Sequence, residues 1–268
     1  MDKKRSLWEY VFLYFQYMKL VIQSRMQYKI DTLMLSFAVL VRESVTVITL
    51  YLMLQKFSSV KGWDIHQLLF MYSFVFLTYS LSVLIFTGIR DFESLVHRGE
   101  FDMYLTKPLG TMFQVISAKS DIMASLGHGA LGIILFVYSA SAIHLKLSFY
   151  HGLVLLLTIL GGILIHAALL IIPSTFTFWT VRSREVKMLM FNQMRGFIVY
   201  PIPIYPKVLQ VILTFVFPFA FVSYFPAQIF IGEVSVWGYL TPVVGVGFFL
   251  LSLAFWNFGV RRYSSSGN

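Results

Sequence analysis

The sequence predicts an all-α membrane protein with six transmembrane helices, an amphipathic interfacial helix at its N-terminus, and both termini in the cytoplasm. The first observation behind this prediction is composition: 58% of the 268 residues are hydrophobic and 12% are charged. An ordinary soluble domain carries about 25% charged residues, and so few polar side chains do not cover the surface of a soluble globule. Composition therefore argues against a soluble enzyme, a disordered protein and a nucleic-acid-binding domain, so that no nucleic-acid partner is expected.

The second observation is the length of the apolar segments. A helix needs about 20 mostly apolar residues to cross the hydrocarbon of a bilayer, and every backbone polar group must be satisfied within the lipid. Six continuous apolar segments meet this length, at about residues 30–54, 66–88, 116–143, 153–181, 208–231 and 237–260. They predict a transmembrane domain over residues 30–260, with a cytoplasmic segment 1–29 before it and a cytoplasmic tail 261–268 after it.

The third observation is the distribution of basic residues. The chain has 21 Lys and Arg against 12 Asp and Glu, which gives a net charge of +9. With a cytoplasmic N-terminus, all but four basic residues fall in cytoplasmic segments: Lys56, Lys61 and Lys146 lie outside, and Arg42 lies within a span. Because basic residues mark cytoplasmic loops, both termini are predicted to be cytoplasmic. The absence of cysteine is compatible with a bacterial inner membrane, and the histidines show no metal-binding spacing.

Segment 1–29 has the pattern of an amphipathic helix. Its apolar residues recur at spacings of three and four with polar residues between them, which predicts a helix lying in the membrane interface. Such a helix is either a simple anchor or an elbow that transmits motion from a partner to the first span. The apolar positions are Trp8, Val11, Phe12, Phe15, Met18 and Ile22.

Two adjacent charges, Arg42 and Glu43, lie near the middle of the first predicted span. A charge at this depth costs at least ~2.5–3.5 kcal/mol, and neighbouring residues point about 100° apart on a helix, so each is expected to find a partner on another helix. His128 and His166, in later spans, are candidates for interhelical polar contacts. Structural pairing is the simpler interpretation, and contact with an anionic substrate along a translocation path is the alternative; the set is Arg42, Glu43, Thr46 and Thr49.

The cytoplasmic connection 89–110 carries a second amphipathic pattern. Phe92, Leu95 and Val96 recur at helical spacing among alternating charges, which predicts a short helix that Gly99 ends. The spacing repeats until Pro108 stops it. Such a helix either seats in a groove of another protein or folds onto the base of its own bundle, and the spacing favours neither. The candidate docking residues are Arg90, Asp91, Phe92, Glu93, Leu95, Val96, Phe101, Tyr104 and Leu105.

Prolines predict a break in the fifth span. Three prolines between Tyr200 and Pro206 exclude a regular helix there, and Pro218 predicts a kink within the apolar run that follows. Small residues in three later spans favour close approach of helices: Ser125 and Gly129 in the third, Gly161 and Gly162 in the fourth, and Gly245 and Gly247 in the sixth. A broken helix followed by an outer segment that dips into the membrane suggests a gate, with candidate residues Pro218, Phe219, Phe221, Tyr224, Phe225 and Pro226.

The sequence offers no site for catalysis. It contains no G-x-x-x-x-G-K-[ST] phosphate-binding loop, no H-E-x-x-H and no G-x-S-x-G motif. No compact set of convergent polar groups can be assembled within the spans. The chain is therefore expected to have no catalytic residue, no enzyme activity, no metal site and no bound cofactor.

The order of these features resembles the permease subunit of type-2 ABC exporters: an amphipathic helix, six spans, a helical connection between spans two and three, and a broken fifth span. Residues 98–109 (RGEFDMYLTKPL) look like that family's glycine–acid–tyrosine–leucine–basic–proline stretch. Residues 200–206, 217–227 and 256–263 are similar to a daunorubicin- or viologen-exporter-like subgroup. The resemblance covers nearly the whole chain.

The resemblance implies a dimer of two permeases, identical or paired, around a central path. Two separate ABC ATPase subunits, which would bind ATP and magnesium, would dock on the cytoplasmic side, and the coupling helix would lie within residues 90–107. The expected cargo is an amphipathic small molecule, a lipid or a peptide, for which an aromatic content of 18% suits an apolar path. Two alternatives stay open: a stand-alone secondary transporter, which would need several deep ionisable groups, and a membrane immunity or peptide-binding protein.

Overall fold

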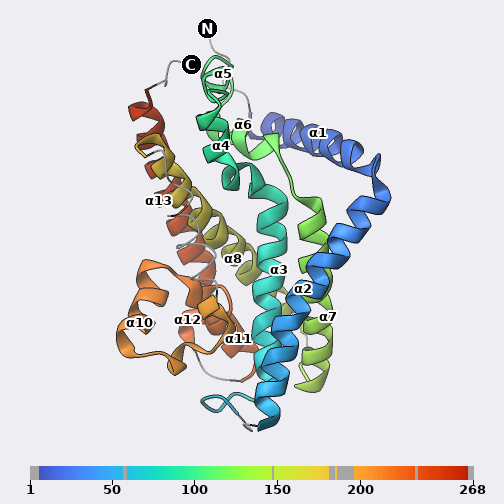
Figure 1. The fold of residues 1–268 in the computed structure, drawn as a ribbon. Coiled ribbons are helices and arrows are strands. Elements are labelled where there is room, and N and C mark those ends of the chain that lie inside the picture. Colours follow the sequence, from blue (N-terminus) through green and yellow to red (C-terminus); the bar gives the residue numbers. More distant parts are fainter. Residues whose placement is uncertain are drawn as a thin grey trace.

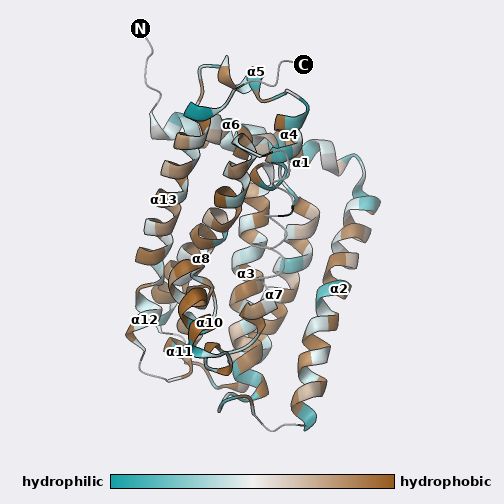
Figure 2. Cartoon of the chain, turned by 60° about the vertical axis from the view of Figure 1, so that its left-hand side comes forward, coloured by the Kyte–Doolittle hydropathy of each residue, from teal (hydrophilic) through white to brown (hydrophobic). Residues whose placement is uncertain are grey.

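The computed structural model describes residues 6–56, 59–146, 148–180, 185, 196–232 and 235–264. These residues form helices and contain no β-strand, only one isolated bridge between Val60 and Trp63. Hydrophobic residues run along the long helices and hydrophilic ones gather at the ends of the bundle (Figure 2). Five helices are long and apolar enough to cross a membrane: α2 (Lys29–Lys56), α3 (Ile65–Arg90), α7 (Ile122–Ala142), α8 (Phe149–Thr175) and α13 (Thr241–Arg262).

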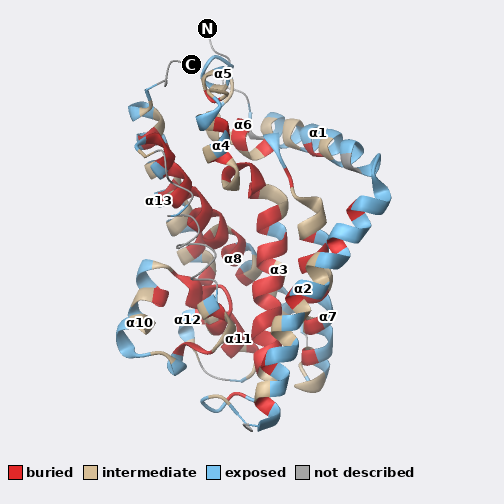
Figure 3. Cartoon of the chain, in the orientation of Figure 1, coloured by how far each residue is buried: buried red, intermediate tan, exposed pale blue. Residues whose placement is uncertain are grey.

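Helix α3 is the centre of the bundle. It is buried along most of its length (Figure 3) and packs against both α7 and α8. Its start is fixed by Asp64, whose side chain accepts from the backbone N–H of Gln67 at 2.9 Å while the Gln67 side chain accepts from the N–H of Asp64 at 3.0 Å. This reciprocal capping satisfies two donors that a helix start leaves open. The helix bends at Phe86, whose backbone is not helical.

The third apolar segment, predicted as one span over 116–143, is divided in two. Helix α6 (Thr111–Ala118) ends at Lys119, which has extended backbone angles, and α7 starts after Asp121, whose side chain accepts from the N–H of Ala124. The hydroxyl of Ser120 donates to the carbonyl of Leu84 on α3 at 2.6 Å. The division follows from Ser120-Asp121, because such residues start helices more readily than they continue them.

The fifth apolar segment does not form one straight helix. Helix α10 (Lys207–Val211) continues as a π-helical turn, η5 (Ile212–Val216), and stops at Pro218. After a 3₁₀ turn, η6 (Phe219–Phe221), helix α11 (Tyr224–Phe230) runs at 72° to the first half. The break predicted at Pro218 is therefore present. Among the residues that the structure describes, five helices have the length and apolar composition to cross a membrane, or six if this bent pair forms one span. Helices α10, α11 and α12 (Val236–Tyr239) lie together at the end of the bundle opposite α1 (Figures 1 and 2).

Helix α1 (Leu7–Met26) lies across the other end of the bundle, where α13 also ends (Figure 1). Its inner side packs on α6: Met18 is buried, and the ring of Tyr10 meets that of Phe113 edge-on at 5.0 Å. Its outer side exposes Trp8, Phe12 and Phe15. Of the predicted apolar face, Met18 thus faces the bundle while these three aromatic residues face away, as in a helix at a lipid interface.

Glycines allow α8 and α13 to approach closely. A Cβ at Gly245 of α13 would lie 2.5 Å from the backbone oxygen of Gly161 on α8, and a Cβ at Gly161 would lie 2.7 Å from the backbone oxygen of Thr241. Such separations are impossible for any larger residue without moving a backbone. The close packing predicted from these small residues is confirmed, and it brings α8 and α13 together over much of their length.

Candidate functional site

A cluster of aromatic rings fastens the connection between α3 and α7 to the bundle. Phe92 begins α4 (Phe92–His97), Phe101 precedes α5 (Asp102–Leu105), and neither side chain is exposed. Their ring centroids lie 5.1 Å apart at 89°. Phe92 also meets Trp256 at 4.6 Å and Phe178 at 5.2 Å, while Phe101 meets Tyr263 at 5.1 Å. These five rings, here called the aromatic anchor, tie α4 and α5 to the ends of α8 and α13 through favourable edge-to-face contacts.

Gly99 terminates α4, as the sequence predicted. Its φ is +68°, a conformation that L-residues with a side chain adopt at a cost. The N–H of Gly99 donates to the carbonyl of Val96 at 3.0 Å, and the N–H of Glu100 donates to that of Leu95 at 3.1 Å. This pair of bonds is a Schellman motif, which satisfies two open carbonyls at the helix end and turns the chain toward Phe101.

The outer surface of α4 and α5 is open. Met103 is 56% exposed and Leu105 45%, and Arg98 spans both carboxylate oxygens of Glu100, with Nε donating at 2.6 Å and Nη2 at 3.2 Å. The candidate docking residues therefore divide by depth: Phe92, Leu95 and Phe101 are buried in the chain's own bundle, Arg90, Asp91, Glu93, Val96 and Tyr104 are half-buried, and Leu105 is exposed.

Ion pairs join the end of α3 to the start of α7. Arg90 Nη2 donates to Asp121 Oδ2 at 3.0 Å, and Lys119 Nζ donates to Asp91 Oδ2 at 3.3 Å. These side chains are partly exposed, and such pairs contribute only ~0–1 kcal/mol each. Their effect is to orient α4 relative to α7 rather than to hold the fold together.

Within the spans, Arg42 pairs differently from the prediction. Its Nη2 lies 2.8 Å from Oε1 of Glu43, its neighbour on α2. The expectation of an interhelical partner is wrong for Arg42, because a long flexible side chain can curl across the angle between neighbouring residues. It is right for Glu43, which is buried and whose Oε1 lies 3.3 Å from Nε2 of His128 on α7. The polar stripe faces outward from this chain: the side chain of Arg42 is 67% exposed, Thr49 is exposed and Thr46 is half-buried.

His128 is held in one orientation. Its Nδ1 lies 2.6 Å from the carbonyl oxygen of Ala124, so Nδ1 carries a hydrogen and donates it there. Its Nε2 lies 3.3 Å from Oε1 of Glu43, an approach that is favourable only with a proton on one of these two atoms. Tyr79 on α3 meets the His128 ring edge-on at 4.8 Å and the His166 ring on α8 at 5.7 Å. The two histidines thus join four helices through one tyrosine, in agreement with the predicted interhelical contacts.

We expect Glu43 and His128 to be energetically coupled. Glu43→Gln and His128→Asn each remove one partner, and the double variant should lose less than the sum, with a coupling of roughly 0.5–3 kcal/mol. Denaturant titration of the purified chain in detergent measures this. Glu43→Gln combined with Met103→Ala serves as the control and should be additive within about 0.5 kcal/mol. Additivity in the Glu43–His128 pair would mean that the 3.3 Å approach contributes nothing.

The candidate gate residues come together around the break. Phe219 and Phe221 are buried, and the ring of Phe221 meets that of Phe225 at 4.9 Å. Phe225 stacks on Trp237 at 5.9 Å, and Tyr224 packs on Trp63 at 5.3 Å. The segment after α11 turns at Gly232, whose φ is +86°. Their role as a gate stays a prediction, whereas their clustering at the end of the bundle opposite α1 is a structural fact (Figure 1).

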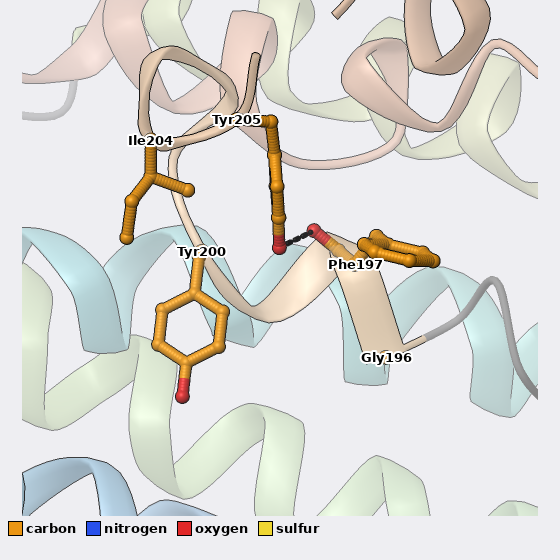
Figure 4. A pocket seen from close by; sticks show the side chains of 5 residues that line it. All are labelled: Gly196, Phe197, Tyr200, Ile204 and Tyr205. Atoms are coloured by element: carbon orange, nitrogen blue, oxygen red, sulfur yellow. Dashed lines mark hydrogen bonds between the residues drawn. The ribbon is translucent and has the colours of Figure 1, made fainter. Parts of the chain in front are cut away.

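An aromatic cavity of about 440 Å³ lies before α10 (Figure 4). Two 3₁₀ turns, η3 (Gly196–Val199) and η4 (Ile202–Ile204), alternate here with extended prolines, so the exclusion of a regular α-helix is confirmed. The hydroxyl of Tyr205 donates to the backbone carbonyl of Phe197 at 3.0 Å. Gly196, Phe197, Tyr200, Ile204 and Tyr205 line the cavity, a surface suited to an apolar group with few polar contacts. In the described part of the chain no group of three or more carboxylates and histidines could hold a metal.

Sequence reasoning missed three residues of the aromatic anchor: Phe178, Trp256 and Tyr263. Phe178 and Trp256 complete the cluster around Phe92, but they lie far along the chain, and helical spacing reports only the face of the element that carries it. The available signal was the unusual density of aromatic residues at the ends of the fourth and sixth apolar segments.

These helices define a multi-pass membrane protein, with five apolar helices of spanning length and a sixth apolar segment bent at its middle. A family model described as ABC-2 family transporter protein matches residues 40–267. The chain therefore belongs to the ABC-2 family of transporter proteins. Membership implies association with an ABC ATPase and with a membrane. No curated protein and no solved structure matches the chain significantly.

Proposed function

We propose that this chain is the permease subunit of an ATP-binding cassette exporter of the daunorubicin- or viologen-exporter-like subgroup. It performs no catalysis and binds no cofactor; separate ABC ATPase subunits, two per complex, bind and hydrolyse ATP with magnesium. Two permease chains, identical or different, form the translocation path. The cargo is an amphipathic small molecule, a lipid or a peptide, and the complex resides in the bacterial cytoplasmic (inner) membrane with both permease termini in the cytoplasm.

The observation that carries this proposal is the position and support of α4 and α5. They project at the end of the bundle where α1 begins and α13 ends (Figure 1), and the aromatic anchor binds their inner side while Met103 and Leu105 stay exposed. Moving a two-state equilibrium from 1:99 to 99:1 takes ~5.5 kcal/mol of differential interaction. A helix packed firmly on α8 and α13 can deliver such an input to the spans, whereas a loosely attached loop would absorb it.

The outward face of α2 supports a second permease chain. Among the spans, α2 is the least buried in the single chain, and the Arg42 side chain at its middle is 67% exposed. Lipid contact for an arginine at this depth costs at least ~2.5–3.5 kcal/mol. Coverage by another protein chain, or a place beside an aqueous path between two chains, removes that cost.

A stand-alone secondary transporter is the second candidate, and the buried Glu43–His128 pair is what favours it, because such pairs can bind protons in transport. Purification from native membranes in a mild detergent distinguishes the exporter subunit from the secondary transporter. The exporter requires an ATPase chain at equal stoichiometry with the permease, and ATP hydrolysis by the complex. Nucleotide-independent pumping by the purified chain in vesicles would establish the secondary transporter, and a single bound peptide without ATPase would indicate the immunity or binding protein.

We expect Leu105→Asp to weaken ATPase association at least about tenfold, a change of ~1.4 kcal/mol, without changing the stability of the permease. Leu105 is exposed on α5, so a carboxylate there disturbs only a partner that covers it. The matched control is Phe149→Asp, at the opposite end of the bundle, where the side chain is 91% exposed. Copurification of the ATPase with each variant measures the effect, and equal yields for both would remove α5 from the docking surface.

A further inference from the structure

A second cavity, of about 230 Å³, lies between α1, α6 and residues 104–109. These residues comprise the end of α5 and the connection after it, and are called the 104–109 loop below. Leu20 and Val21 of α1, with Leu109 and Ala118, form its apolar wall. Its polar groups come from Tyr17, Tyr104, Lys107, Gln114 and Ser117. It therefore joins the interfacial helix to the end of α5, which carries Tyr104, and to the segment that follows it. Tyr104 stacks on Phe101 of the aromatic anchor at 6.4 Å, so the cavity adjoins the anchor, while it lies apart from the pairs within the spans and from the segment around Pro218.

Gln114 lines this cavity and carries a buried acceptor, Oε1. The residue is only 6% exposed, and its Nε2 donates to the carbonyls of Tyr104 at 2.8 Å and Leu109 at 2.7 Å. Two carbonyl acceptors require the NH₂ group on that side, so the orientation of the amide is fixed. Its Oε1 is then left buried with no hydrogen-bond partner. A buried acceptor of this kind costs free energy unless a ligand or water supplies a donor.

The other polar groups of the cavity suit an anion. The Lys107 ammonium lies 5.2 Å from the centroid of the Tyr104 ring, and the Lys107 residue is exposed. Burial raises the pKa of the Tyr104 hydroxyl above its ordinary value, with Glu100 and Tyr17 adding to the shift, so this hydroxyl is a donor at neutral pH. A cation and two phenolic donors favour phosphate or carboxylate oxygens, while Gln114 Oε1 requires a donor on the same ligand.

The position of the cavity indicates which ligand can supply both an anionic group and a hydrogen-bond donor. Helix α1 exposes Trp8, Phe12 and Phe15 along its outer side, and aromatic residues of this kind gather at the level of the lipid headgroups. A headgroup there offers a phosphate at high local concentration, and its acyl chains extend toward the apolar surface of α1. A cavity of 230 Å³ is too small for a whole lipid but accepts part of a headgroup.

We propose that this cavity binds the headgroup of a phospholipid that carries a hydrogen-bond donor beyond its phosphate, as phosphoethanolamine and phosphoglycerol do. The phosphate pairs with Lys107 and the hydroxyls of Tyr17 and Tyr104, and the ammonium or hydroxyl donor satisfies Gln114 Oε1. Phosphocholine can place its phosphate beside Lys107, but it cannot satisfy Gln114 Oε1, since its quaternary ammonium has no N–H to donate. The bound lipid then links α1 to the 104–109 loop, and through it to α5.

The first test needs no variant. The chain, with whatever partners copurify, is reconstituted in nanodiscs containing equal parts of phosphatidylethanolamine, phosphatidylglycerol and phosphatidylcholine, and the retained lipids are counted by native mass spectrometry. We expect phosphatidylethanolamine and phosphatidylglycerol to be retained over phosphatidylcholine by about tenfold, the effect of one hydrogen bond to a charged or polar group. Equal retention of phosphatidylethanolamine and phosphatidylcholine, which have the same net charge, overturns the proposal.

The second test separates the two contacts. Lys107→Gln should lower retention of all three lipids by about tenfold and leave the preference for a donor headgroup in place, because that preference resides at Gln114. Lys61→Gln makes the same change of charge in the α2–α3 connection, at the other end of the bundle, and should have no effect. Equal losses for the two variants would mean that charge at any site suffices. Added inorganic phosphate that displaces the lipid at millimolar concentration would assign the site to free phosphate instead, and contradict the proposal.

Discussion

Replacing Phe92 by alanine should lower the free energy of unfolding by about 3–5 kcal/mol, the range for removing a fully buried phenylalanine ring. The ring has no exposed surface and meets Phe101, Phe178 and Trp256 within 5.2 Å. Its loss opens a cavity where three elements far apart in the sequence converge, and these elements cannot close it without shifting α4. Denaturant titration of the purified permease in detergent measures the change.

Two controls define what the Phe92 result means. Phe92→Leu keeps most of the buried volume and should cost less than half as much, and Met103→Ala, on the exposed side of α5, should stay within about 0.5 kcal/mol of wild type. An alanine variant as stable as wild type would contradict the packing of the ring. The two Phe92 variants also test docking of the ATPase, because Phe92 affects a partner only by positioning α4. ATPase association should fall for Phe92→Ala and be restored by Phe92→Leu.

The sequence predicted the helix that carries Phe92 but not the surface it covers. The spacing of Phe92, Leu95 and Val96 identifies one apolar face, and Gly99 identifies the helix end, since both signals are local. Whether that face meets a partner or the chain's own bundle depends on Phe178 and Trp256, which only the tertiary fold brings close. The residue types that make a good docking helix also make a good internal anchor, so the pattern could not separate them.

The same limit applies within the membrane. The depth of Arg42 and Glu43 follows from counting residues along an apolar segment, and the need for partners follows from the cost of a buried charge. Which partner each finds depends on side-chain conformation for Arg42 and on helix packing for Glu43, whose contact with His128 joins α2 to α7. The break at Pro218 was predictable because proline acts on its own helix, whereas the one at Ser120 required weighing a helix-start signal against a continuous apolar run.

Replacing Gly245 by leucine should destabilise the bundle by an amount at or beyond the upper end of the ~1–3 kcal/mol typical of overpacking, with Gly245→Ala intermediate. A Cβ at this position would lie 2.5 Å from the oxygen and 2.8 Å from the Cα of Gly161. Both are backbone atoms, so no side chain can rotate away and α13 has to separate from α8. Separation also displaces Trp256, on the same helix, from the aromatic anchor, so the change should spread to α4.

Gly247→Ala is the matched control, two residues further along the same helix. A Cβ there meets nothing within 4 Å, and alanine is the better helix former by up to about 1 kcal/mol, so this variant should be as stable as wild type or slightly more stable. Thermal unfolding in nanodiscs, read by tryptophan fluorescence, compares the pair under identical conditions. Equal melting temperatures for Gly245→Ala and Gly247→Ala would show that α8 and α13 do not approach at Gly161, because backbone propensity is the same at both positions and only the contact differs.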